Sequence, residues 1–283
     1  MAVRPAAVAG TWYPGSAGAL TRDVDAYVAA AADWPGGEIR AVVAPHAGLM
    51  FSGHVGAYAY KAAATQSFDV AVLVGPSHYV AFEGVALYPD GAFATPLGEV
   101  AIDKDGARRL QSSALIRILP GAHQREHSLE MQLPFLRRLI PEMPMVPLLM
   151  GRQRRETITA LADLLADVFR DRQVLLVAST DLSHYFDAPT AIALDGRVQE
   201  LIGAFDVDGL LERFEQYPEH ERGRFVACGG GPMLAVMMAA RALGAADARV
   251  LRYAHSGEIS GDNDGVVGYV AAAFGNFAGR PQG

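Results

Sequence analysis

Short apolar segments that each end near a histidine are the feature of this sequence that most constrains its fold. The segments and the histidines that follow them are Val42–Ala44 with His46, Val72–Val74 with His78, Leu175–Val177 with His184, and Val250–Tyr253 with His255. Continuous apolar runs separated by longer helical patterns are typical of buried strands in a parallel sheet. Because the carboxyl ends of such strands open onto one crevice, we expect the four histidines to meet there.

The order of the predicted elements indicates the fold class. Strands are predicted over 40–44, 69–75, 84–88, 145–150, 173–179, 249–254 and 266–274. Helices are predicted over 17–34, 54–65, 104–112, 127–139, 155–170, 190–203, 207–214 and 232–243. We therefore predict one α/β domain over residues 1–283, with a mostly parallel central sheet and helices on both faces. The excursion from Tyr88 to Leu119 is predicted to contain a local hairpin.

Composition excludes several classes of function. The net charge of −7 argues against a non-specific nucleic-acid binder or a polybasic membrane protein. The longest uncharged stretch, residues 41–60, contains prolines, histidines and glycines that disfavour a membrane span. The single cysteine, Cys228, forms no disulfide within the chain, which fits a reducing cytoplasm. Walker A, GxGxxG and GxSxG motifs are absent from the sequence.

The histidines at the predicted strand ends favour a metal site. Neutral imidazole is the commonest nitrogen ligand of divalent transition metals, and Cys228 adds a thiolate. Cys228 precedes Gly229-Gly230-Gly231-Pro232, a predicted turn into a helix whose N-terminus would lower the thiol pKa. The alternative for Cys228 is a small buried apolar residue. The adjacent glycines favour the functional interpretation, since they let the backbone approach a neighbour closely.

A second polar cluster spans Glu126-His127-Ser128-Leu129-Glu130. On a helix, Glu126 and Glu130 would share a face, and His127 would face Glu130. Such a group could orient a ligand through hydrogen bonds, although acidic residues at a helix N-terminus are an equally good explanation.

Five motifs, taken in this order, resemble the Memo family. They are Ala44-Pro-His-Ala-Gly48, Gly75-Pro-Ser-His78, Glu126-His-Ser-Leu-Glu-Met-Gln-Leu-Pro134, Ser179-Thr-Asp-Leu-Ser-His184 and Tyr253-Ala-His-Ser-Gly257. The opening Arg4-Pro-Ala-Ala-Val-Ala-Gly-Thr-Trp-Tyr-Pro14 is also similar to the start of that family, so the resemblance extends to about Phe274.

The resemblance implies the fold of class III extradiol dioxygenases and a set of site residues. His46 and His78 match the two metal-ligand histidines, and Cys228 matches a cysteine where the dioxygenases are expected to place a carboxylate. His184 matches the acid/base histidine, with Asp181 in the same motif, and His127 matches another pocket histidine. The residues expected to contact substrate are Ser77, Glu126, Gly229, Gly230 and His255.

Three functions follow from the residues and the resemblance. The first is a non-haem metal-dependent oxidoreductase that uses Fe(II) or copper, with zinc as an alternative. The second is a module that binds phosphopeptides or proteins on a non-catalytic dioxygenase fold, with the glycine-rich helix start as an anion site. The third is a metal-dependent hydrolase in which zinc activates water. Similarity to members of the AmmeMemoRadiSam system also implies a radical-SAM protein and a small protein as partners.

Overall fold

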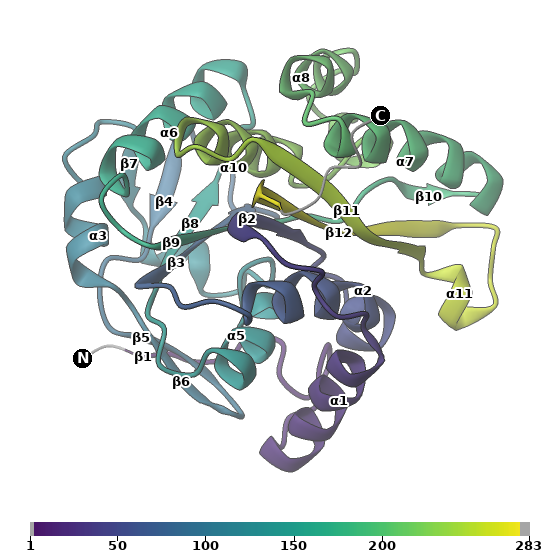
Figure 1. The fold of residues 1–283 in the computed structure, drawn as a ribbon, viewed down its shortest axis with the longest axis horizontal. Helices are drawn as coiled ribbons and strands as arrows, with labels where there is room; N and C mark the ends of the chain where they lie inside the picture. The colour runs from purple at the N-terminus through teal and green to yellow at the C-terminus, as the bar shows by residue number, and fades with distance from the viewer. Residues whose placement is uncertain (1–2, 278–283) are drawn as a thin grey trace.

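Four parallel strands form the centre of the main sheet (Figure 1). The computed structural model describes residues 3–277. In spatial order the central strands are β2 (Glu38–Ala44), β9 (Val174–Ser179), β3 (Val70–Pro76) and β8 (Met145–Met150). Every residue of β3, β8 and β9 is buried, as expected for strands that are apolar on both faces.

Antiparallel strands extend this parallel centre on both sides. Strand β12 (Val266–Asn276) pairs antiparallel with β2, and β11 (Asp247–His255) pairs antiparallel with β12. At the other side, β4 (Val85–Leu87) pairs antiparallel with β8 and parallel with β7 (Ile116–Ile118). The predicted α/β class is confirmed, but the sheet is more mixed than predicted. The connection between β11 and β12 is too short for a parallel crossover, which explains the antiparallel pair.

Helices cover both faces of the sheet, as predicted (Figure 1). One face is covered by α1 (Ala17–Ala30), α2 (Leu49–Ala63) and α5 (Leu133–Leu139). The other is covered by α6 (Arg155–Val168), α7 (Ala188–Gly203), α8 (Val207–Glu215) and α10 (Gly230–Ala242). Helix α6 buries Ile158, Leu161 and Leu165, whose three- and four-residue spacing places them on one side of the helix.

The remaining elements are short. Strands β1 (Val3–Arg4), β5 (Ala92–Thr95) and β6 (Gly98–Ala101) form a small second sheet, in which β5 and β6 are the predicted hairpin. The others are α3 (Lys104–Leu110), α4 (Pro120–His123), a 3-10 turn η1 (Glu130–Gln132), β10 (His184–Phe186), α9 (Arg222–Phe225) and α11 (Gly257–Ser260). One apolar core joins these layers. Within residues 3–277, none of the helices combines the length and apolar character needed to cross a bilayer.

Candidate functional site

The order of the central strands brings three of the predicted motifs together. Strands β2, β9 and β3 are adjacent and parallel, so their carboxyl ends lie side by side. His46 follows β2, Asp181 follows β9 and His78 follows β3. The Asp181 carboxylate accepts hydrogen bonds from the His46 and Ala47 backbone N–H groups over 2.8 and 3.3 Å, which ties the turn after β2 to the turn after β9.

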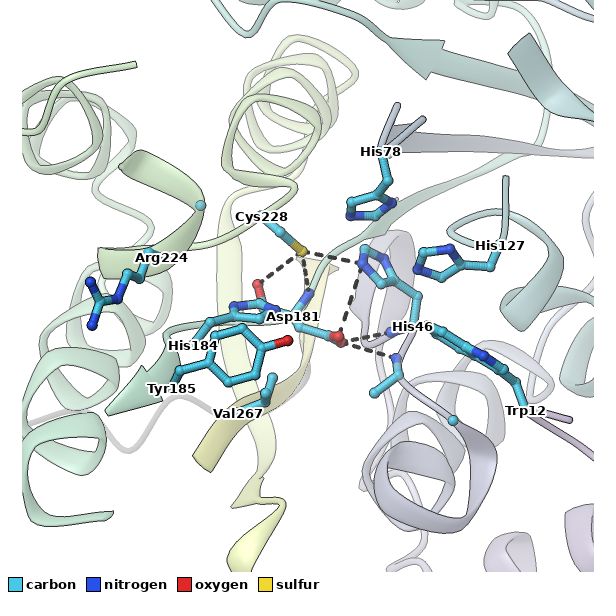
Figure 2. Close-up of a pocket in the computed structure, with 13 residues that line it drawn as sticks. Trp12, His46, His78, His127, Asp181, His184, Tyr185, Arg224, Cys228 and Val267 are labelled. Atoms are coloured by element: carbon cyan, nitrogen blue, oxygen red, sulfur yellow. Dashed lines mark hydrogen bonds and ion pairs between the residues drawn. The ribbon is translucent and has the colours of Figure 1, made fainter. Parts of the chain in front are cut away.

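Cys228 reaches the same point from the loop between α9 and α10 (Figure 2). Its backbone N–H donates to the Asp181 carbonyl over 3.2 Å, and the Asp181 N–H points back at Cys228 Sγ over 3.3 Å. Cys228 Sγ lies 3.2 Å from His46 Nε2. One ligand atom from each of His46, His78 and Cys228 falls within 4.8 Å of the others. These are the three residues predicted to hold the metal.

A hydrogen-bond chain behind His46 determines which ring nitrogen faces the cavity. The Ser179 hydroxyl donates its only hydrogen to the Ser128 carbonyl over 2.6 Å. The Gln132 amide nitrogen donates to the Ser179 oxygen over 2.8 Å. His46 Nδ1 lies 2.9 Å from that oxygen and must therefore be the donor. His46 Nε2 is left facing Cys228: while protonated it can donate to the thiolate, and without that proton its lone pair has the orientation that a metal ligand requires.

Glu126 fixes His78 in the same way. Its carboxylate accepts the backbone N–H of His78 over 2.6 Å and lies 2.9 Å from His78 Nδ1. It also accepts the N–H groups of His127 and Ser128, each over 3.0 Å. A carboxylate with these contacts only accepts, so His78 donates through Nδ1 and leaves Nε2 for a metal. Glu126 is 2% exposed and orients His78 rather than contacting a ligand.

The predicted helix over 127–139 is wrong at its start. The chain forms turns until η1, and α5 begins only at Leu133. The Glu126 side chain takes the N–H groups of His127 and Ser128, which closes a local turn in place of a helical one. Glu126 and Glu130 consequently do not share a helix face: the first binds His78, and the second pairs with Arg4 over 2.6 Å.

His184 is oriented by the backbone. Its Nδ1 lies 2.7 Å from the Leu182 carbonyl oxygen, which can only accept, so Nδ1 is the donor and Nε2 is free. His184 lines the cavity beside Asp181 and Cys228. Burial raises the pKa of Asp181, and nearby His184 and hydrogen bonds from His46 act in the opposite direction.

His127 is a wall of the cavity. Its ring lies 4.6 Å from the His78 ring, nearly parallel to it, and 4.2 Å from the Trp12 ring. Burial, together with positive charge on His46 and His78, lowers the pKa of His127 to about 3, so its ring is neutral at ordinary pH. A neutral ring offers no acidic proton at ordinary pH, but it can position His78.

The cavity that joins these residues has a volume of about 520 Å³ (Figure 2). Sequence reasoning missed the side chains that complete its wall, which are Trp12, Tyr185, Arg224 and Val267. Trp12 stands within the quoted opening segment and Tyr185 directly follows the motif that ends at His184, and their aromatic type was the available signal. Tyr185 is 70% exposed and has a left-handed φ of 62°, a conformation that non-glycine residues seldom adopt away from functional sites.

All five predicted substrate contacts, Glu126 included, lie outside the lining of this cavity. Strand β12 separates His255, at the end of β11, from β2. Ser77 donates to the Val80 carbonyl over 2.8 Å. The backbone at Gly229 and Gly230 does approach neighbours closely, as predicted, but those neighbours are protein. A Cβ on Gly229 would lie 2.4 Å from the Ser179 carbonyl oxygen, and one on Gly230 would lie 2.3 Å from the Phe214 ring.

The start of α10 is closed to an anion. Gly229 N–H donates to Thr180 Oγ1 over 2.9 Å, and Gly230 N–H donates to the Ala227 carbonyl over 3.1 Å. Gly231 N–H donates to Gln153 Oε1 over 2.7 Å. Pro232 follows and has no N–H. The first donors of the helix are therefore used, and the anion site expected for a phosphopeptide-binding module is not formed.

Two imidazoles, rather than the helix, stabilise the Cys228 thiolate. Burial alone would raise the pKa of Cys228, but the charge of His46 and hydrogen bonds from His46 and His78 lower it to about 6. Burial alone would lower the pKa of His78, but its hydrogen bonds to Cys228 and Glu126 raise it to about 10. A thiolate and an imidazolium thus coexist over a wide pH range, and a metal would displace the proton of the imidazolium.

We expect metal-free protein to react with iodoacetamide at a rate that is half-maximal near pH 6, because the thiolate forms above the lowered pKa of Cys228. An ordinary thiol would show its midpoint at about 8.5. Alkylation measured by mass spectrometry between pH 5 and 9 gives the midpoint. In His46→Ala the midpoint should move to higher pH. A wild-type rate that still rises steeply above pH 8 would contradict the assignment.

Replacing Glu126 with glutamine should weaken metal binding by about 10- to 100-fold, the usual effect of losing a group that orients a ligand. The glutamine side chain has an NH₂ donor in place of one carboxylate oxygen. That donor would face either the His78 N–H groups or the N–H groups of the following turn, so His78 would lose its fixed orientation. A competition titration against a chromophoric chelator measures the affinity. The matched control is Glu258→Gln, because the Glu258 side chain is 41% exposed. Equal affinities of both variants would show that Glu126 does not orient a ligand.

Comparison with known proteins agrees with the sequence motifs. The model of the Memo-like protein family matches residues 4–273. A MEMO1 family protein of Methanopyrus kandleri is 39% identical over 238 residues, which cover 82% of each chain. A MEMO1 family protein of Nitrosopumilus maritimus is 32% identical over 280 residues, or 96% of this chain and 99% of that one.

A solved structure supports the fold alone. An uncharacterised protein of Escherichia coli K12 superposes with a TM-score of 0.59 at 13% identity, covering 84% of this chain and all of that one. The family match over nearly the whole chain, together with relatives above 30% identity, decides the classification: the chain belongs to the Memo-like protein family.

Proposed function

We propose that this protein binds a redox-active transition metal through His46, His78 and Cys228 and uses it in an oxidoreductase reaction on a small organic ligand. The observation that supports this most is the fixed orientation of the donors. Independent hydrogen bonds from Nδ1 to Ser179 and to Glu126 leave the two Nε2 atoms directed at the cysteine. The buried His46 imidazole, the partly exposed His78 imidazole and a thiolate in this arrangement fit a metal better than they fit a closed apolar core.

The other cavity residues have roles that follow from their contacts. His184 presents Nε2 to the cavity and can give or take a proton from a bound ligand. Asp181 holds the His46 and Cys228 backbones in register. Trp12 and Val267 supply an apolar wall that excludes water from the ligand. The metal, when bound, would supply redox or Lewis-acid chemistry.

The thiolate bears on the identity of the metal. A site with two imidazoles and one thiolate favours copper or zinc, whereas two imidazoles and a carboxylate are typical of Fe(II). We propose a redox-active ion, copper by this donor set or iron by the resemblance of the fold to the dioxygenases, with zinc as the alternative that would point to hydrolysis instead. A cysteine that serves as a metal ligand must remain a free thiol, and thiols remain free in the reducing cytoplasm. We therefore further propose that the protein works in the cytoplasm.

Replacing Cys228 with aspartate should shift metal preference toward iron without destroying the site, because the carboxylate is a harder ligand of similar reach. Wild-type and variant protein purified without oxygen and loaded from an equimolar mixture of Fe(II), Cu(I) and Zn(II) would be compared by elemental analysis. Cys228→Ala is the control for loss of the ligand. An unchanged metal ratio in the aspartate variant would show that Cys228 is not a ligand.

The activity itself is tested by oxygen consumption. Metal-loaded wild-type protein is mixed with a panel of catechols and other chelating aromatic compounds, and uptake is recorded with an oxygen electrode. His184→Gln, which retains the metal ligands, should bind metal normally and lose turnover. Oxygen uptake that does not depend on metal or on His184 would contradict the oxidoreductase proposal. Stoichiometric zinc with ester or peptide hydrolysis would favour the hydrolase instead.

A further inference from the structure

A second cavity adjoins the first at Cys228. Its volume is about 400 Å³, and it lies between the loop after β3, the loop after β8 and the start of α9. His78, Gly223 and Cys228 line this cavity as well as the first. Two of the three proposed metal ligands therefore form the partition between two cavities.

The exposure of the ligands agrees with access from this side. The His78 side chain is 28% exposed, whereas that of His46 is 2% exposed. His46 lies behind the Ser179 hydrogen-bond chain, but His78 stands on the loop that lines the second cavity. Gly223, shared by both cavities, has no side chain to extend the partition: a Cβ there would lie 3.4 Å from Cys228 Cα, an ordinary contact.

The walls of the two cavities differ in chemistry. The first is lined by the rings of Trp12 and Tyr185 and by Arg224, and the second by the Phe214 ring and by Arg152 and Arg222. Arg152 is neutralised by Glu83 and Glu219, at 3.2 and 3.5 Å. Arg222 donates only to the Tyr217 and Gln153 carbonyls, and it forms no ion pair with any residue of the 3–277 range. The Arg222 guanidinium is therefore a cation of this wall that has no carboxylate within ion-pair distance among residues 3–277.

We propose that the second cavity is a separate entrance to the His78–Cys228 side of the metal centre and that it admits small anions. The organic ligand would occupy the first cavity. A small hydrophilic reactant would then reach the metal centre through the second cavity, without having to pass the organic ligand. The presence of a metal at His78 and Cys228 rests on the function proposed above. The second entrance does not depend on that function, because the two cavities and their shared residues are present without a metal.

Metal-free protein gives a direct test, because Cys228 is the single thiol of the chain. The probes are an anionic reagent, 2-sulfonatoethyl methanethiosulfonate, and a neutral one, methyl methanethiosulfonate. In each case the thiolate attacks the sulfenyl sulfur, a disulfide forms and methanesulfinate leaves. Rates are followed by mass spectrometry for the wild type and for variants that each narrow one cavity.

Ala81 lines only the second cavity and Val267 only the first. Ala81→Trp should slow the anionic reagent by about fivefold or more, whereas Val267→Trp should leave at least about half of the wild-type rate. Val80→Trp, on the same exposed loop as Ala81, narrows the second cavity independently and should have the same effect. The entrance is disproved if Val267→Trp alone stops both reagents while the two loop variants react like the wild type. Thermal melting excludes misfolded variants.

Arg222→Gln tests the charge preference. The variant should lower the ratio of anionic to neutral rates by about threefold or more, because the unpaired guanidinium attracts the anion. Arg224→Gln, at the mouth of the first cavity, is the matched control and should change the ratio less. An unchanged ratio in Arg222→Gln would overturn the preference for anions. Failure of metal binding would leave these rates unaffected, so the entrance and the proposed function can fail separately.

Discussion

Replacing His46 with alanine is expected to abolish stable metal binding. The change removes an imidazole that is 2% exposed and already oriented by Ser179, leaving His78 and Cys228 to hold the ion. The loss should exceed the about 10- to 100-fold effect of removing a group that merely orients a ligand, as in Glu126→Gln. Competition titration against a chelator, with elemental analysis of the purified variant, measures it.

Two comparisons make this test specific. His220→Ala removes an imidazole whose side chain is 81% exposed, and it should bind metal like the wild type. His46→Gln restores the bulk of the side chain and should bind as weakly as His46→Ala. If the alanine variant retains the wild-type affinity while His78→Ala or Cys228→Ala loses it, the ion is held on the opposite side of Cys228 and the assignment of His46 is wrong.

The position of the candidate site could be predicted from the sequence because strand ends in a parallel sheet obey a simple rule. The strand before His78 is apolar throughout and the strand before His46 is apolar from Ala41 to Ala44. Their pairing through β9 brings the two histidines within reach of each other. Cys228 is different. It precedes a helix rather than following a strand, so the local pattern made it only a candidate thiolate, and the resemblance to the Memo family matched it to the metal site.

The differences from prediction arise where a long-range contact overrides a local pattern. His255 ends a strand that runs in the same direction as β2, but the intervening β12 keeps it out of the lining of the cavity. The predicted helix over 127–139 is wrong at its start, where Glu126 closes a turn and also binds His78, which is far away in sequence. Gly230 is packed against Phe214, a neighbour that no local pattern reveals. Each difference involves a partner more than ten residues distant along the chain.

The second large effect concerns stability and starts from Arg4, which no pattern singled out. Arg4 is 2% exposed, pairs with Glu130 over 2.6 Å, and donates to the His123 and Glu126 carbonyls over 2.6 and 2.5 Å. Glu130 in turn accepts the Tyr13 hydroxyl over 2.7 Å. This buried pair ties the first strand and the segment before Trp12 to the turn that orients His78.

Arg4→Met should therefore lower the free energy of unfolding by about 3–5 kcal/mol, because it leaves the Glu130 carboxylate buried without its cation. Urea denaturation followed by circular dichroism measures the loss. Arg138→Met is the matched control: its ion pair with Asp25 has both side chains 44% exposed, so it should cost less than about 1 kcal/mol.

The same substitution should also loosen the site, which a purely global loss of stability would not do. Trp12 is anchored by its carbonyl, which accepts the Leu49 N–H over 2.8 Å, and by the segment that Glu130 holds. In a Trp34→Phe background Trp12 is the single tryptophan, so acrylamide quenching of its fluorescence reports on this segment alone. Quenching should increase in Arg4→Met under conditions where the protein remains folded. An unchanged quenching constant, with stability within about 1 kcal/mol of the wild type, would mean that the buried pair does not hold the cavity wall in place.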